Sequence, residues 1–211
     1  MHAQLTEVPP AKPRVEGSML HRLSVDEFEQ MADLEIVPSD ASVELIDGLV
    51  YLRDRSGHGE EPTEVNPAHA YAVHALGLLD GPIRGLGPFH LRAEKPVQVS
   101  ESYRPLPDAS IVRGSFRDYA ARHPDAGDAL CVVEVSISTL NFDRATKLPL
   151  FARAGIPQYV ILDLDHRQAE VHADPKPDGT YGRREVVVAD GTLTVVLDEH
   201  RLDVPLAELL P

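Results

Sequence analysis

Three carboxylates and one lysine are the residues of this chain whose types and positions could carry out chemistry. Glu44, Asp108 and Glu134 each lie on or beside a predicted strand, and Lys147 lies on the predicted helix that follows Glu134. Carboxylate oxygens suit hard divalent cations such as Mg²⁺, which take one or two protein carboxylates together with waters and substrate phosphates. Such a cation polarises a phosphoryl oxygen and activates its bound water, while a nearby lysine stabilises developing charge or orients that water. Together, the four residues fit metal-assisted hydrolysis of a phosphodiester.

Three of the four residues also have an ordinary structural explanation. Glu44 alternates with apolar neighbours, as a solvent-facing strand residue does, and Asp108 stands where a turn aspartate would precede a strand. A lysine on an amphipathic helix usually keeps its charge in water, so Lys147 alone indicates little. Glu134 is different, because it interrupts the apolar run LCVVEVS. A buried carboxylate costs free energy unless it binds a proton, a cation or a strong donor, so Glu134 needs a partner.

The central elements of the chain form one predicted unit, from residue 128 to residue 165. The runs LCVVEVS and QYVILDLD are nearly continuous apolar sequence, which is typical of strands buried on both faces. Between them lies a predicted helix that ends at Gly155. A strand, a crossover helix and a strand of this length indicate a βαβ unit with parallel strands. Because Pro149 lies inside the helical pattern, the helix either starts near Asp143 and kinks, or starts near Thr146 with Pro149 in its first turn.

The other two acids lie on further predicted strands. Glu44 belongs to VELIDGLVYL, in which an Asp-Gly pair between two apolar runs predicts a β-hairpin. Asp108 precedes ASIV, a predicted short buried strand, and PFHLRA and KPVQVSE predict two more strands before it. From Arg167 onward, QAEVHA, GRREVVVA and LTVVLDEH alternate as strands do, and they predict an antiparallel extension of the sheet.

Two helices are predicted ahead of the central unit. Ser24 and Glu27 have capping-box spacing at the start of a short amphipathic helix. Asn66 and Pro67 predict the start of a second helix, which we expect to end near Gly81.

These elements predict one domain of the α/β class. Its central sheet is mixed and flanked by helices, with an antiparallel hairpin extension. Residues 1–18 contain several prolines and few large apolar groups, so we expect a disordered leader there and a single domain over residues 19–211.

Composition limits the classes of function. The 211-residue chain has 43% hydrophobic and 26% charged residues, which is ordinary for a globular protein. Its formal net charge of −14 counts against DNA binding unless a local basic groove is present. The single cysteine, Cys131, cannot build a disulfide framework or a zinc knuckle. No apolar run reaches the length of a membrane helix and the N-terminus lacks a signal-peptide core, so we expect a cytoplasmic protein with no membrane partner.

Three motifs resemble those of the PD-(D/E)XK nuclease superfamily, and more closely those of the Uma-two family of restriction endonuclease-like proteins. They are VELIDG, LPDASIV and the long run VVEVSISTLNFDRATKLPLFARAGIPQYVILD, and the likeness extends over residues 20–210. The long run is the most specific of the three. The superfamily places its lysine two residues after the strand acid, where this chain has Ser136. The resemblance therefore implies a lysine that has moved to the following helix, which is Lys147.

The resemblance implies a restriction-endonuclease-like fold and an endonuclease that hydrolyses DNA with Mg²⁺ or Mn²⁺. Asp108, Glu134 and the backbone carbonyl of Val135 would hold the metal, and Glu44 would complete the site directly or through water. Lys147 would position the attacking water. A homodimer would suit this activity, because a two-fold pair is a natural way to cut both strands of a duplex.

Two other functions stay open. A nuclease-like fold without catalysis would serve as a binding module for a protein or a nucleic acid, and the acidic net charge favours this reading. A histidine-based metal site is disfavoured, because His69 and His74 are not three or four residues apart and do not share a helical face. The resemblance leaves open whether His69 approaches the site, and it implies that Asp143 and Arg144 support the site rather than bind metal.

Overall fold

The computed structural model describes residues 14–15, 18–37, 43–52 and 66–211. Most of the predicted leader lies outside these residues, so the division into a leader at 1–18 and a domain at 19–211 stays a prediction. Two short strands, β1 (Arg14–Val15) and β2 (Ser18–Met19), pair antiparallel at the start of the described part.

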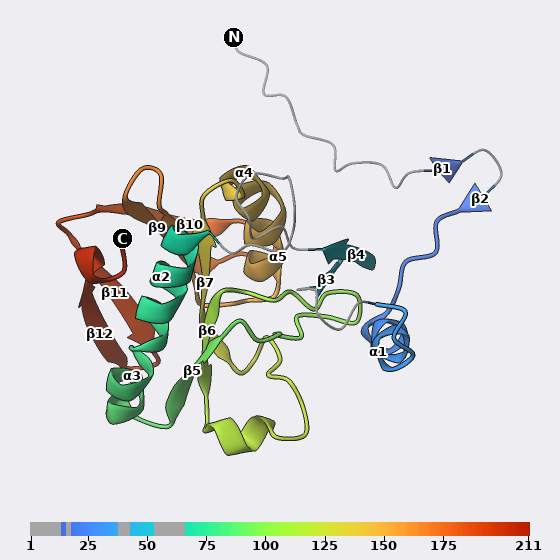
Figure 1. The fold of residues 1–211 in the computed structure, drawn as a ribbon, viewed down its shortest axis with the longest axis horizontal. Helices are drawn as coiled ribbons and strands as arrows, with labels where there is room; N and C mark the ends of the chain where they lie inside the picture. The colour runs from blue at the N-terminus through green and yellow to red at the C-terminus, as the bar shows by residue number, and fades with distance from the viewer. Residues whose placement is uncertain (1–13, 16–17, 38–42, 53–65) are drawn as a thin grey trace, which may run out of the picture.

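A six-stranded sheet forms the centre of the fold, in the order β10-β9-β8-β7-β6-β5 (Figure 1). Its neighbouring strands are antiparallel except for β7 and β8, which are parallel and confirm the predicted βαβ unit. The mixed sheet also confirms the predicted α/β class. The strands are β5 (Phe89–Ala93), β6 (Ala109–Arg113), β7 (Ala129–Ser136), β8 (Gln158–Asp163), β9 (Gln168–Pro175) and β10 (Tyr181–Val188).

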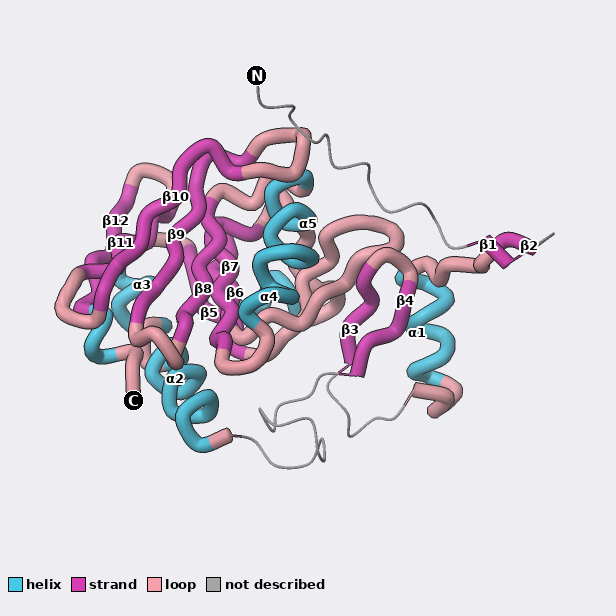
Figure 2. Tube along the Cα trace, turned by 90° about the horizontal axis from the view of Figure 1, so that it is seen from above, coloured by secondary structure: helices cyan, strands magenta, loops and turns pink. Residues whose placement is uncertain are grey.

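Different elements cover the two faces of this sheet (Figure 2). One face packs against helices α2 (Pro67–Gly77) and α3 (Asp80–Leu86) and against the hairpin of β11 (Thr192–Leu197) and β12 (His200–Pro205). The other face packs against the crossover, which consists of α4 (Leu140–Phe142), the π-helix η2 (Asp143–Lys147) and α5 (Leu148–Arg153). Because β7 has apolar layers on both faces, all eight of its residues are buried. Two 3₁₀ segments complete this part of the chain: η1 (Phe116–Tyr119) and η3 (Leu206–Glu208).

The N-terminal elements form a smaller unit beside the sheet (Figure 1). Helix α1 (Val25–Asp33) begins with the predicted capping box, in which Ser24 and Glu27 satisfy each other's backbone amides. Strands β3 (Val43–Ile46) and β4 (Leu49–Leu52) form the predicted hairpin. Asp47 and Gly48 at its turn both have positive φ, as the tightest hairpin turns require.

Three expectations about the elements are wrong. Residues 95–101, predicted as a strand, make only isolated bridges. The segment LTVVLDEH does not extend the sheet, because Leu193, Val195 and Leu197 of β11 are buried in the core on its face. The second helix ends at Gly77, and α3 begins a new helix before the predicted end near Gly81. No helix among the described residues is long and apolar enough to cross a membrane.

The core that carries the crossover gives a first testable prediction. Phe151 of α5 is fully buried, with its ring centroid 5.1 Å from that of Tyr159. We expect Phe151→Ala to lower the free energy of unfolding by about 3–5 kcal/mol, because it leaves a cavity. Phe116→Ala is the matched control: its ring is 66% exposed, so its loss should cost less than about 0.5 kcal/mol. Urea denaturation measures both, and equal costs would contradict this packing.

Candidate active site

The ammonium group of Lys147 lies between two buried carboxylates. Its Nζ is 2.9 Å from Oε1 of Glu134 and 3.0 Å from Oε1 of Glu44. All three residues are at most 2% exposed. The surface positions that pattern alone allowed for Glu44 and Lys147 are therefore wrong. Charges this deeply buried persist only when they are paired, so the three side chains hold one another in place.

Asp108 lies beside this cluster, at the entry to β6. Its Oδ2 accepts a hydrogen bond of 2.7 Å from the backbone N–H of Val135, the residue after Glu134. Its side chain is fully buried. The pairing of β6 with β7 explains the position, because Ala109 lies opposite Val133 in the sheet. Asp108 and Glu134 are thus brought together by two neighbouring strands.

His69 reaches Asp108 from the other side. It lies on the first turn of α2, which Asn66 caps by accepting a hydrogen bond from Ala68 N–H at 2.9 Å. The Nε2 of His69 is 3.1 Å from Oδ1 of Asp108. The structure therefore brings His69 to Asp108, an approach that the sequence had left open.

Glu44 comes from the β3–β4 hairpin, far from the other three in sequence. Its Oε1 accepts a hydrogen bond of 2.8 Å from the backbone N–H of Leu106. A backbone bridge between Leu45 and Arg104 fixes the hairpin against the same segment. This segment leads directly into Asp108, so two of the acids are positioned by one stretch of backbone.

Lys147 is delivered by a π-helix rather than by a regular α-helix. The crossover is helical from Leu140, widens to π geometry over Asp143–Lys147, and resumes as α5 with Pro149 in its first turn. Proline has no N–H to donate to the preceding turn, which explains a change of helical pattern at this point. The helical backbone therefore begins before both predicted starts, at Leu140, although Pro149 does lie in the first turn of α5. Single π turns are rare and are frequent at functional sites.

Asp143 anchors the first turn of η2. Its Oδ2 accepts hydrogen bonds from Ser136 Oγ, at the end of β7, and from Thr139 Oγ1 at 2.8 Å. Burial raises the pKa of Asp143, while the charge of Lys147 and these two hydroxyls favour its ionised form. Ser136, which stands where the superfamily has its lysine, thus has a structural role here.

Arg144 anchors the same turn on its other side. It forms an ion pair with Glu170 of β9, whose side chain also pairs with Arg184 at 3.1 Å and with His172 at 3.3 Å. Burial alone would raise the pKa of Glu170, but the two arginines outweigh this and lower it to about 2. Sequence reasoning missed Glu170. A signal was present, because Glu170 and His172 are two residues apart in the predicted strand QAEVHA and therefore lie on the same face of it.

The donor set has the chemistry that a hard divalent cation requires. Carboxylates from three segments and the backbone of β7 meet at one end of the sheet. Within the described ranges, however, no group of three or more His, Cys, Asp or Glu residues forms a ready coordination set. The position of Lys147 accounts for this absence, because its ammonium group occupies the space between the carboxylates of Glu44 and Glu134. Mg²⁺ needs only one or two protein carboxylates, which Asp108 and Glu134 can supply.

Two comparisons with known proteins found a match to this chain. The family model described as "Uma2: Putative restriction endonuclease" matches residues 25–205. The crystal structure of a putative nuclease belonging to DUF820, from Anabaena variabilis ATCC 29413, superposes with a TM-score of 0.63 at 15% identity. The match covers 89% of this chain and 97% of that chain, so the two share a fold. No curated protein matches the chain.

The buried cluster predicts how stability responds to loss of the lysine. Lys147→Met leaves the carboxylates of Glu44 and Glu134 buried without their shared cation, and we expect it to cost about 3–5 kcal/mol. Adding Glu44→Gln removes one of the two charges, so the double variant should be more stable than Lys147→Met alone. Urea denaturation measures the parent protein, Lys147→Met and the double variant. A double variant that is no more stable than Lys147→Met would contradict the cluster.

The ion pairs of Glu170 predict a pH dependence of stability. Because its folded pKa of about 2 lies below the ordinary value near 4.5, its contribution is present above about pH 4.5 and is lost as the pH falls towards 2. We expect Glu170→Gln to cost about 1–2 kcal/mol at pH 7, since the exposed arginines are screened by solvent. The cost should shrink between pH 4.5 and pH 3. Glu185→Gln on β10 is an exposed control, and a cost for Glu170→Gln that does not change with pH would contradict the account.

Proposed function

Because this chain belongs to the Uma2 family, we propose that it is an endonuclease that hydrolyses DNA phosphodiester bonds with a divalent cation. One observation carries the proposal: Lys147, Glu134, Glu44 and Asp108 come from four segments and meet in one buried cluster. Lysines with a purely structural role are rarely this buried. Burying this group of charges costs desolvation free energy that an apolar core would avoid, and such clusters are typical of functional sites.

The residues that would hold Mg²⁺ or Mn²⁺ are Asp108 and Glu134, with the backbone carbonyl of Val135 and with Glu44 directly or through water. A cation bound there supplies charge stabilisation for the phosphoryl oxygens and lowers the pKa of its water. Val135 contributes twice in this proposal, because its N–H already holds Asp108 in place.

We assign Lys147, His69 and Asp143 the roles of donating hydrogen bonds and of holding neighbouring groups in position. Lys147 donates hydrogen bonds, and we assign to it the orientation of the attacking water or of a phosphate oxygen. His69 faces Oδ1 of Asp108 at 3.1 Å, so a proton on Nε2 would orient that carboxylate. Asp143 keeps the turn of Lys147 attached to the end of β7 through Ser136.

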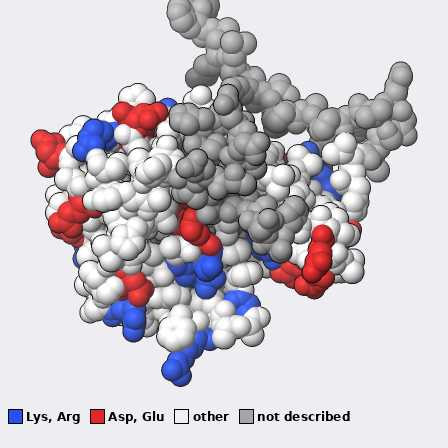
Figure 3. Space-filling view, in the orientation of Figure 1, with Lys and Arg blue, Asp and Glu red and all other residues white. Residues whose placement is uncertain are grey.

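The acidic net charge of the chain does not extend over its whole surface. Figure 3 shows Lys and Arg side chains gathered on the lower half of one face, over β5 and η1. Local positive patches, rather than total charge, meet the phosphates of a nucleic acid. This distribution supports DNA as the substrate, and a homodimer would allow both strands of a duplex to be cut.

A second candidate function is a nuclease-like fold that binds a protein or a nucleic acid without cutting. The bonds of Lys147 to both Glu44 and Glu134 favour it, because they occupy acids that a metal would need. The two candidates differ in metal binding. Mn²⁺ should raise the melting temperature of a metal-dependent nuclease, and Asp108→Asn should abolish this rise. A binding module predicts no rise in either protein.

Cleavage of supercoiled plasmid DNA tests the proposal. We expect the parent protein to nick or linearise the plasmid in Mg²⁺ or Mn²⁺, and Asp108→Asn and Glu134→Gln to lower the rate at least about 100-fold. Lys147→Met should do the same at a temperature where circular dichroism shows it folded. Lys176→Met removes an exposed lysine and serves as the control. Parent-like cleavage by Asp108→Asn and Lys147→Met would overturn the assignment.

A further inference from the structure

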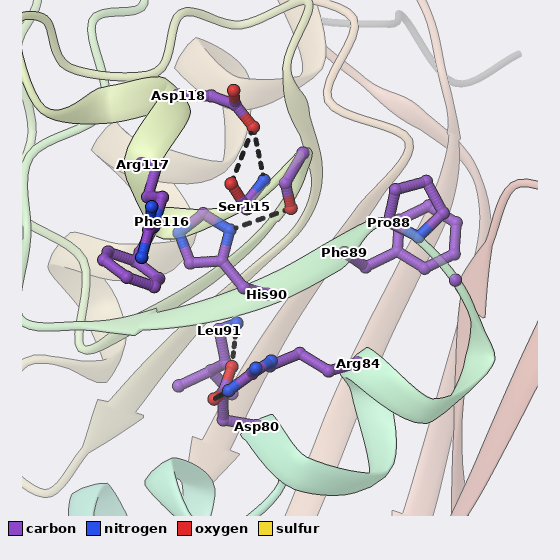
Figure 4. A pocket seen from close by; sticks show the side chains of 12 residues that line it. Asp80, Arg84, Pro88, Phe89, His90, Leu91, Ser115, Phe116, Arg117 and Asp118 are labelled. Atoms are coloured by element: carbon purple, nitrogen blue, oxygen red, sulfur yellow. Dashed lines mark hydrogen bonds and ion pairs between the residues drawn. The ribbon is translucent and has the colours of Figure 1, made fainter.

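A hollow of about 570 Å³ lies between α3 and η1 (Figure 4). Its lining does not include the residues of the acidic cluster. Its walls include Arg84 of α3, His90 of β5, and Phe116 and Arg117 of η1. Gly114, which lines the hollow, follows the last residue of β6, whereas Asp108 precedes the first residue of that strand. At about 3.3 Å per residue, the strand from Asp108 to Gly114 spans roughly 20 Å. The volume is in the usual range for a small-molecule site.

The mouth of the hollow combines an exposed aromatic ring with two guanidinium groups. Phe116 is 66% exposed, and Arg117 lies over its ring with Cζ 5.7 Å from the centroid. Within the described part of the chain, Arg117 makes no ion pair. Arg84 stands on the facing helix, and its contact with Asp80 is long, at 3.6 Å. Aromatic rings beside arginines are typical of surfaces that hold bases and phosphates.

The carboxylates in the hollow have structural partners. Asp80 accepts a hydrogen bond of 3.0 Å from the N–H of Leu91. Asp118 accepts from the N–H of Ser115 at 2.6 Å and from its hydroxyl at 3.0 Å, which closes the capping box of η1. These bonds attach both acids to the backbone, whereas the arginines extend to the rim.

His90 adds an acceptor without a partner. Its Nδ1 lies 3.2 Å from the carbonyl oxygen of Gly114, so Nδ1 carries the proton and Nε2 is an acceptor in the neutral ring. Burial lowers the pKa of His90, which keeps the ring neutral. The residue is 6% exposed, and Nε2 has no hydrogen-bond partner among the described residues. Figure 4 shows this edge of the ring turned towards Phe116 and Arg117. A buried acceptor of this kind costs free energy until a donor reaches it.

We propose that this hollow binds one nucleotide, either free or as part of a nucleic acid strand that also reaches the acidic cluster. The base stacks on Phe116 and offers an N–H to His90, and the phosphate lies between Arg84 and Arg117. In the strand form, the inference rests on the proposed function and adds a contact roughly 20 Å from Asp108.

The test measures binding by the full chain in EDTA, so that no cleavage occurs. The probes are deoxyadenosine monophosphate, inorganic phosphate and a 12-nucleotide single strand. We expect Phe116→Ala to weaken binding of the nucleotide or the strand about tenfold, since each stacked base contributes that order of affinity. Arg117→Gln should lower the salt slope of strand binding by about 0.7. Arg201→Gln, an exposed arginine on β12, is the control.

The outcomes separate the two sources of nucleotide. Saturable binding of the monophosphate, weakened by Phe116→Ala and not by Arg201→Gln, identifies a free-nucleotide site. Binding of the strand alone, with the same sensitivity, identifies a substrate contact. If Phe116→Ala and Arg117→Gln bind every probe as Arg201→Gln does, the inference is overturned. Because binding is measured in EDTA, where no cleavage occurs, a failure of the proposed cleavage leaves this result unaffected.

Discussion

The fold depends on the ammonium group of Lys147 and its two carboxylate partners. A buried lysine is stable only with charged partners at hydrogen-bond distance, and Glu134 and Glu44 supply them at 2.9 and 3.0 Å. Because the three residues lie far apart in sequence, the charges join the central strand, the crossover and the N-terminal hairpin. Removing the ammonium group leaves two buried carboxylates that no longer share a cation. The cluster therefore links the position of the hairpin to that of the sheet.

The crossover has to bring Lys147 to this point, and its geometry reflects that requirement. The π turn is held on one side by Asp143, which is bonded to Ser136 of β7, and on the other by Arg144, which is bonded to Glu170 of β9. Each anchor includes a buried carboxylate with matched donors, which is Asp143 itself on one side and Glu170 on the other. A wide turn between two such anchors lets the lysine face the strand that carries Glu134. Contacts with two strands of the sheet, β7 and β9, therefore fix the orientation of the Lys147 side chain.

Much of the site was predictable from sequence, for identifiable reasons. Glu134 interrupts a strand that is apolar on both faces, so its chemistry is visible in the pattern, and the long motif around it identifies the family. Asp108 and Glu44 became candidates through their motifs, since pattern alone allowed surface positions. The π turn and the arginine partners of Glu170 were not predictable, because they depend on contacts between segments far apart in sequence. The β11–β12 hairpin was misplaced because strand alternation reveals a buried face but not the surface that covers it.

The central claim is that these side chains form one metal site. The most direct test is a crystal structure of the full chain soaked in Mn²⁺, with anomalous diffraction recorded at the manganese edge. The account predicts an anomalous peak between the carboxylates of Asp108 and Glu134, within coordinating distance of the Val135 carbonyl, and no such peak in Asp108→Asn. A peak elsewhere, or a saturated crystal in which Lys147 still bridges Glu44 and Glu134 with no manganese beside Asp108, would contradict it.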